Sequence, residues 1–519
     1  MKTRASLVVV AVTAGLALAG CGGAASSDKT AKVDPAVQRV LRLAFFSDMA
    51  TADPNVFYDI EGDAISQSVY DGLLRYRAGT TELEGALAES WKVSGDRRTY
   101  TFALRDAKFS DGSPVTSDAV QKSFERLTKV DQGPAYMLAD VKRYVTPDPR
   151  TFVVELKQPV ASFADLMASV WGPKVINPSV LDKYSKDQAQ KHLKTNAAGT
   201  GPFMLTSWRP GKGYTLKRNP NYWGKEPYFE RVEIAVKPDV SSQLLELQRG
   251  DLDGVLHGVP LSSVQSLKGK GGLKVERFDS LGTVTLAINQ DRPELKDRAV
   301  REALVRALDV PTLVRNVWGE SATAMKSAYP QPLLPSGAAP ISYPYDQAAI
   351  KAAIPKGTKV EVVYSPDSSG VQRRFADLMR QQLGKVGVTV SPRQAELSAV
   401  FAYRDNTAKA PDFYISTPTP DAATPDAWAR IVWHSGGGLN FFNYANKQVD
   451  AMMDQAVKEP DEARAKALYA EAGTMAVSEF GEAPIAQVKD TMVLRGDLTG
   501  VEHVPAYPWT LNLGELGRK

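Results

Sequence analysis

The chain has 519 residues, more than one hydrophobic core usually fills, so its length predicts two or three domains. Its 63 basic and 59 acidic residues nearly balance, and no basic stripe with interleaved aromatic residues occurs, which argues against a nucleic-acid partner. The single cysteine excludes an intramolecular disulfide, so stability must come from the burial of apolar side chains.

The N-terminus has the features of an export signal. A positively charged start precedes an apolar run at 7–18 that is too short to span a bilayer comfortably, and small residues follow it. The order Leu18-Ala19-Gly20-Cys21 resembles the bacterial lipobox, in which the leader is cut before a cysteine that becomes lipid-modified. We therefore expect a signal peptide at 1–20 and a lipid anchor on Cys21.

The residues that follow this cysteine predict a flexible tether. Residues 21–33 are small and polar, and they carry too little apolar surface to offset the entropy cost of ordering them. No later segment has 18 consecutive apolar residues. We expect the rest of the chain to be held at the extracytoplasmic face of the bacterial cell membrane without crossing it.

The first part of the body predicts strands and a helix. At 99–105 and at 151–157, apolar residues alternate with polar ones, as in half-buried strands. Between them, the stretch 117–127 has apolar residues at helical spacing, with Ser117 or Asp118 as its expected cap. This region therefore reads as α+β.

The later half alternates strand and helix signals. A short apolar strand is expected at 360–364, a helix at 371–385 and the start of a second strand at 386–390. Strand, helix and strand at this spacing predict a parallel pair with a right-handed crossover. Two further helices are expected at 297–308 and 461–479.

Motifs of catalysis and metal binding are missing from the sequence. The four histidines lie far apart, and neither a His-Glu-x-x-His nor a Cys-x-x-Cys pair occurs. A Gly-x-Ser-x-Gly elbow and a phosphate-binding loop are also missing. We therefore expect no enzyme, no metal and no cofactor, although a catalytic triad scattered along the chain stays open as an alternative.

Several short stretches, taken together and in this order, resemble the extracellular solute-binding proteins of family 5, the peptide and nickel receptors of ABC importers. The most specific of them is Phe109-Ser110-Asp111-Gly112-Ser113-Pro114. The others include Ala52-Asp53-Pro54, Val69-Tyr70-Asp71-Gly72-Leu73, Gly199-Thr200-Gly201-Pro202-Phe203 and Arg218-Asn219-Pro220-Asn221-Tyr222-Trp223. The resemblance covers nearly the whole chain after the tether.

The resemblance implies an α/β fold of the type II periplasmic-binding-protein kind, in which two lobes are joined by a two-strand hinge and an extra α+β subdomain is added. Projected onto this chain, lobe I would combine 34–78, 196–285 and 485–519. The extra subdomain would be 79–195, and lobe II would be 286–484.

The resemblance also places a ligand site. Peptide receptors of this family hold the α-ammonium of the ligand with an aspartate of lobe II, and the matching residue here is Asp421. Lobe I would contribute Phe57, Tyr58 and Asp59 from the loop after Pro54, and Trp433 is a further candidate for lining the cleft. Alternatively, Asp421 caps a turn or the following helix, and the aromatic residues belong to the core.

We therefore expect a monomeric, lipid-anchored receptor that closes on a solute, with a short peptide as the first candidate, and delivers it to the permease and ATPase of an ABC importer. The family commonly has a tryptophan where this chain has Pro418, so a sugar, an opine or a chelated metal would fit the altered pocket as well. A surface enzyme or a sensor on the same scaffold is the remaining alternative.

Overall fold

The computed structural model describes residues 39–519 except 268, 336 and 368. The expected signal peptide, the lipid anchor on Cys21 and the tether lie outside the described residues. Within the described part, no helix combines the length and the apolar character needed to cross a bilayer. Residues Arg39–Lys519 form one compact unit, and the boundaries of the expected lobes stay predictions.

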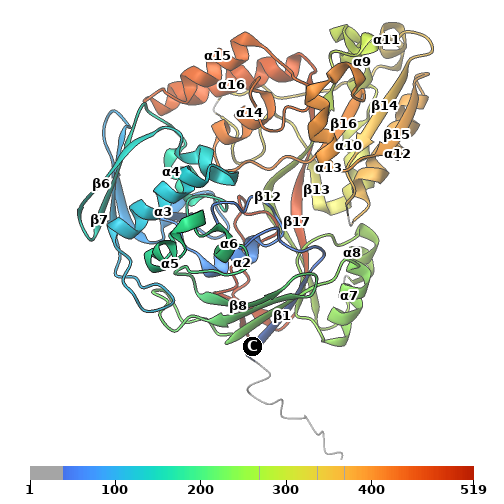
Figure 1. The fold of residues 1–519 in the computed structure, drawn as a ribbon. Coiled ribbons are helices and arrows are strands. Elements are labelled where there is room, and N and C mark those ends of the chain that lie inside the picture. The colour runs from blue at the N-terminus through green and yellow to red at the C-terminus, as the bar shows by residue number, and fades with distance from the viewer. Residues whose placement is uncertain (1–38, 268, 336, 368) are drawn as a thin grey trace, which may run out of the picture. The chain divides into compact units, whose positions relative to one another are not determined.

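Two long antiparallel strands, β12 (Leu273–Ile288) and β17 (Glu482–Arg495), lie in the middle of an 11-stranded sheet (Figure 1). On the β12 side the sheet continues through β16 (Phe413–Ser416), β14 (Lys359–Tyr364) and β15 (Thr389–Gln394). On the β17 side follow β11 (Gly254–Val255), β1 (Val40–Phe45), β10 (Arg231–Val236), β9 (Gly213–Arg218) and β8 (Phe203–Arg209), and β13 (Ala322–Ala324) also pairs with β17.

The expected strand–helix–strand unit is confirmed. Strands β14 and β15 pair in parallel, and helix α12 (Val371–Gly384) connects them. Strand β15 begins at Thr389, three residues later than predicted, because a turn follows the helix and Gly387 adopts φ 87° in it.

The expected strands near 100 and 150 are also confirmed. They are β5 (Thr99–Leu104) and β7 (Thr151–Leu156), antiparallel neighbours in a sheet of order β4–β5–β7–β6 with β4 (Ala88–Val93) and β6 (Val141–Asp148). Helix α3 (Ser117–Val130) packs against β6 and β7. Its cap is Thr116, whose hydroxyl accepts the N–H of Ala119 at 3.3 Å, so the predicted caps Ser117 and Asp118 were wrong by one or two residues.

Two predicted helices of the later half are present. They are α9 (Arg298–Arg306) and α16 (Glu462–Ser478), and α10 (Val310–Trp318) follows α9 without having been predicted. The other helices are α2 (Asp63–Val69), α4 (Phe163–Ala168), α5 (Pro178–Lys183), α6 (Gln190–Leu193), α7 (Val240–Arg249), α8 (Leu261–Leu267), α11 (Gln347–Ala353), α13 (Leu397–Phe401), α14 (Pro425–Trp433) and α15 (Lys447–Ala456). Short strand pairs are β2 (Leu74–Tyr76) with β3 (Leu83–Gly85), and β18 (Leu498–Thr499) with β19 (Gly517–Arg518).

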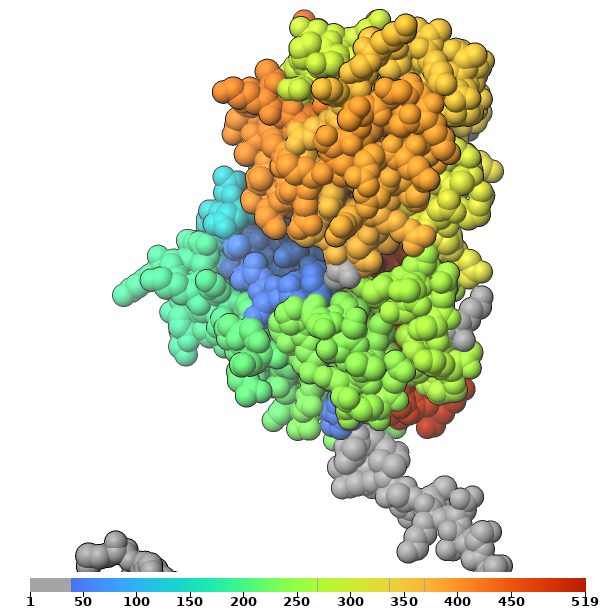
Figure 2. Space-filling model, turned by 90° about the vertical axis from the view of Figure 1, so that its right-hand side faces the viewer, coloured from blue at the N-terminus to red at the C-terminus, as the bar shows by residue number. Residues whose placement is uncertain are grey.

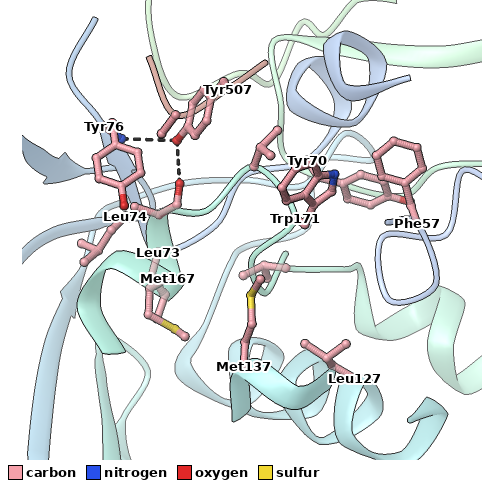
Figure 3. Close-up of a cluster of buried hydrophobic side chains, with 14 of the residues drawn as sticks. Phe57, Tyr70, Leu73, Leu74, Tyr76, Leu127, Met137, Met167, Trp171 and Tyr507 are labelled. Atoms are coloured by element: carbon pink, nitrogen blue, oxygen red, sulfur yellow. Dashed lines mark hydrogen bonds between the residues drawn. The ribbon is translucent and has the colours of Figure 1, made fainter. Parts of the chain in front are cut away.

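A large apolar cluster joins segments from both ends of the chain (Figure 3). The hydroxyl of Tyr507 accepts the N–H of Tyr76 at 3.3 Å and donates to the carbonyl of Ala168 at 2.6 Å. Because these aromatic side chains are buried and their polar atoms are paired, the C-terminal segment is fixed against the first helices and strands.

Candidate ligand-binding site

The loop after Pro54 is anchored by a buried ion pair. The guanidinium of Arg126 on α3 donates to both carboxylate oxygens of Asp53, at 2.8 and 2.6 Å, and also to the amide oxygen of Asn55 at 2.6 Å. The Asp53 and Arg126 side chains are only 1% and 3% exposed. This bidentate ion pair holds the beginning of the loop against α3 and so positions the residues that follow.

The carboxylate of Asp421 accepts hydrogen bonds from two tyrosines that are distant in sequence. The hydroxyl of Tyr58 donates to Oδ1 at 2.6 Å, and the hydroxyl of Tyr136, in the 3-10 helix η1 (Gly133–Leu138), donates to Oδ2. Thr424, rather than Asp421, caps α14 and accepts the N–H of Ala427 at 3.2 Å. The alternative in which Asp421 caps this helix is therefore wrong.

Burial is the main influence on the pKa values of Asp421, Tyr58 and Tyr136. It raises the pKa of Asp421, and the hydrogen bonds from Tyr136 and Tyr58 offset part of that rise. Burial and the neighbouring carboxylate raise the pKa of both phenols, so the tyrosines keep their protons and act as donors. A carboxylate has about four acceptor positions, so two phenols leave part of its acceptor capacity unused.

A third tyrosine holds the same loop through its backbone. The hydroxyl of Tyr76 accepts the N–H of Ala423 at 2.8 Å and donates to the carboxylate of Asp165 at 3.0 Å. Burial raises the pKa of Asp165 to about 7. The segment from Asp421 to Ala423 is thus held by side chains from three other parts of the chain.

The remaining predicted site residues divide between surface and core. Tyr58 as a residue is 45% exposed, and its ring packs edge-on against Trp171 at 5.3 Å between centroids. The indole of Trp171 donates to the carbonyl of Asp59 at 2.9 Å. Phe57 and Trp433 are 3% and 1% exposed and belong to the core, so the structure supports the core alternative for both. Asp59 is exposed at the surface of the same loop.

A cavity of about 680 Å³ lies beside the central strand pair. Strands β12 and β17 contribute Thr283 and Lys489 to its wall, and Ile60 and Trp509 also line it. Thr417 and Thr419 belong to the same lining. The volume is in the range of sites for small ligands.

The segment that carries these two threonines runs beyond the end of β14, whereas β12 continues beside it. Strand β16 pairs with β14 up to Ile415 and with β12 up to Ser416. The carbonyl of Pro418 accepts the N–H of Thr283 at 3.0 Å and so faces β12. Thr417 and Thr419 each precede a proline, which favours an extended backbone. In an extended chain, successive residues direct their backbone N–H and C=O groups to opposite sides. The backbone N–H and C=O groups of Thr417 and Thr419 therefore point away from β12.

Sequence reasoning missed Tyr136, Tyr76 and the cavity residues Glu61 and Trp509. Tyr136 and Tyr76 lie in segments without a recognised ligand motif, and only the folded chain brings them to the loop at Asp421. Among the described residues, no group of three or more His, Cys, Asp and Glu side chains is arranged to hold a metal ion.

The sheet topology, the cavity beside its central strands and the buried carboxylate of Asp421, two residues beyond the lining residue Thr419, fit a binding protein of mixed α/β fold and the type II periplasmic kind. Residues 82–440 match the family model described as bacterial extracellular solute-binding proteins, family 5, middle. The chain belongs to this family, as its sequence motifs had predicted. It is a family of binding proteins rather than of enzymes.

Relatives of this chain cover nearly its whole length. It is 30% identical over 487 residues to the probable D,D-dipeptide-binding periplasmic protein DdpA of Escherichia coli K12, covering 91% of this chain and 93% of that protein. It is 25% identical to the oligopeptide-binding protein OppA of Bacillus subtilis, covering 96% and 97%. The solved structure of DppA from Helicobacter pylori with the peptide STSA matches with a TM-score of 0.80 at 21% identity, covering 92% and 98%.

Proposed function

We propose that this protein is the receptor of an ABC importer and that it binds short peptides in the cavity beside β12 and β17. The observation that carries the proposal is the segment 417–420, which continues from β16 past the end of β14 as an edge, lines the cavity with Thr417 and Thr419, and leads to Asp421. An extended peptide can add to such an edge through its main chain. The names of the dipeptide- and oligopeptide-binding relatives support the same class of solute.

In this proposal Asp421 binds the α-ammonium of the peptide. Tyr58 and Tyr136 orient its carboxylate, and Asp59 lies beside Tyr58 at the surface. An ammonium facing a desolvated carboxylate makes a charge-assisted hydrogen bond, which contributes roughly 1.5–3 kcal/mol against about 1 for a neutral bond. Phe57 and Trp433 would support the site from the core rather than touch the solute.

Closure is the second part of the proposal. The apolar cluster that includes Leu286 and Phe375 is separate from the one that includes Leu43 and Ile234, and this separation supports two lobes. The second cluster also takes in Trp428 and Tyr469, so this part of the projected lobe II packs with the rest of the chain. The strand pair would serve as the hinge, and the subdomain at 79–195 would contribute Tyr136. A peptide that contacts both lobes would favour the closed form by its differential affinity.

The lipid anchor on Cys21 completes the proposal. It would hold the receptor at the outer face of the membrane, where a tether raises its concentration near the permease. Replacing Cys21 by alanine should release the protein from the membrane fraction, whereas the parent chain should stay with it. Equal release of both would contradict the anchor.

The peptide function is tested by calorimetric titration of the purified protein with pools of di-, tri- and tetrapeptides. We expect binding accompanied by a smaller radius of gyration in small-angle scattering. The same pools with acetylated N-termini are the matched control, and they should bind at least tenfold more weakly because they lack the ammonium. Binding of neither pool, or equal binding of both, would contradict the proposal.

A further inference from the structure

Charged side chains of both signs line the 680 Å³ cavity, but their availability to a solute differs. The acidic residues are Glu61, Asp367 and Glu396, and the basic or ionisable ones are His257 and Lys489. In Figure 2 the green segments around α7 and α8 lie below the yellow and orange ones of α12 and α13.

Two of these charges are already used within the protein. The carboxylate of Asp367 accepts the backbone N–H groups of Val371 and Gln372, each at 3.1 Å, at the start of α12. The ammonium of Lys489 donates to the carboxylate of Asp279 at 2.9 Å, and Asp279 does not line the cavity. The Asp367 carboxylate and the Lys489 ammonium are therefore committed to partners of their own.

Glu61 stands in the wall of the cavity beside aromatic rings. Its side chain is 13% exposed, and its Oε1 lies 3.4 Å from Nδ1 of His257. The imidazole packs against Phe46 and Trp509, with ring centroids 4.9 and 4.3 Å away. Among the described residues, His257 is the only basic side chain within ion-pair distance of Glu61.

Glu396 contributes the second uncommitted carboxylate, from the other side of the sheet's central strands. It precedes α13, is exposed, and its side chain makes no cap hydrogen bond to that helix. Among the residues that the structure describes, no cation lies within ion-pair distance of it. The uncommitted charge in the cavity wall is therefore negative.

We propose that the cavity selects solutes that carry a positive charge in addition to their α-ammonium, such as peptides with a basic side chain. This inference rests on the proposed function and specifies its substrate class. In this proposal Glu61 and Glu396 bind the added cation through charge-assisted hydrogen bonds.

The test compares Ala-Lys-Ala with Ala-Met-Ala, two peptides of similar length that differ in one side-chain charge. The purified protein should bind Ala-Lys-Ala at least tenfold more tightly, as a charge-assisted contact implies. Glu61→Gln and Glu396→Gln should each reduce this ratio several-fold. Glu471→Gln changes an exposed glutamate on α16 that does not line this cavity, so it should leave the ratio unchanged.

The outcomes separate this inference from the function on which it rests. Equal affinities for the two peptides would overturn the inference and leave the peptide function standing, as would a Glu61→Gln variant that weakens both peptides alike. Binding of neither peptide, nor of any peptide pool, would overturn both. Glu396 is exposed, so its variant tests the charge preference even if Glu61→Gln impairs folding.

Discussion

The hydroxyl of Tyr58 donates a 2.6 Å hydrogen bond to Asp421, a residue 363 positions further along the chain. Tyr136 donates to the other oxygen of the same carboxylate. Three segments that are remote in sequence therefore meet at one buried acid. Because a buried carboxylate is costly unless its oxygens are paired, these phenols stabilise a charge that can bind a cation.

Asp421→Asn should weaken the binding of peptides with a free N-terminus by roughly ten- to a hundredfold, because it removes one charge-assisted hydrogen bond. The amide oxygen can accept from only one of the two phenols, but the variant also removes a buried charge, so we expect these effects to offset each other and the thermal midpoint of unfolding to change little. Calorimetric titration measures the affinity, and the N-terminally acetylated peptide provides the reference. An unchanged affinity for the free-amino peptide would remove Asp421 from the site.

Arg126→Met should lower the free energy of unfolding by about 3–5 kcal/mol, because it leaves the carboxylate of Asp53 buried without its partner. Arg143→Met is the matched control. It breaks an ion pair with Glu155 in which the arginine side chain is 62% exposed, and such pairs contribute about 0–1 kcal/mol. Urea unfolding of both variants checks this, and equal losses would contradict the structural role of the Asp53–Arg126 pair.

The spacing of apolar residues in the sequence predicted the helices and strands that bury only one face. Strands β5 and β7 and helix α12 each bury one face, and the apolar spacing reports that face directly. The cap of α3 was misplaced because Thr116, Ser117 and Asp118 are all good cap residues, and the sequence does not distinguish among them.

The candidate site was predicted only in part, because it depends on contacts between distant segments. The family resemblance pointed to Asp421 and Tyr58, which the structure brings together. It gave no indication of Tyr136 or Glu61. The sequence could not show whether Phe57 and Trp433 lie in the core or line the cleft, because large aromatic residues occur in both environments.

Gly199→Ala should destabilise the protein by more than 1 kcal/mol. An added Cβ at this position would lie 2.0 Å from the carbonyl oxygen of Val69, at the end of α2, and backbone must move to admit it. Gly95→Ala is the control, because a Cβ there meets nothing within 4 Å and the residue has no positive φ. Equal thermal midpoints for the two variants would contradict the close contact between Gly199 and α2.

Glu482, in the central strand β17, should make stability fall as the pH rises. Burial raises its pKa to about 8 from an ordinary value of 4.5, although the hydroxyl of Thr285 donates to its carboxylate. Between these two values the folded protein binds more protons at this group than the unfolded chain does. Its contribution to stability is therefore fully present below about pH 4.5 and is lost as the pH rises through about 8.

Glu482→Gln removes this titration while keeping the size of the side chain and an acceptor for Thr285. At acidic pH the variant and the parent protein should have similar free energies of unfolding. At alkaline pH the variant should be more stable, by an amount on the order of a few kcal/mol, because the parent must ionise a buried carboxyl group. Urea unfolding across this pH range, with Glu471→Gln as the exposed control, measures the difference. Parallel stability curves for Glu482→Gln and the parent would show that Glu482 ionises as easily in the folded chain as in the unfolded one.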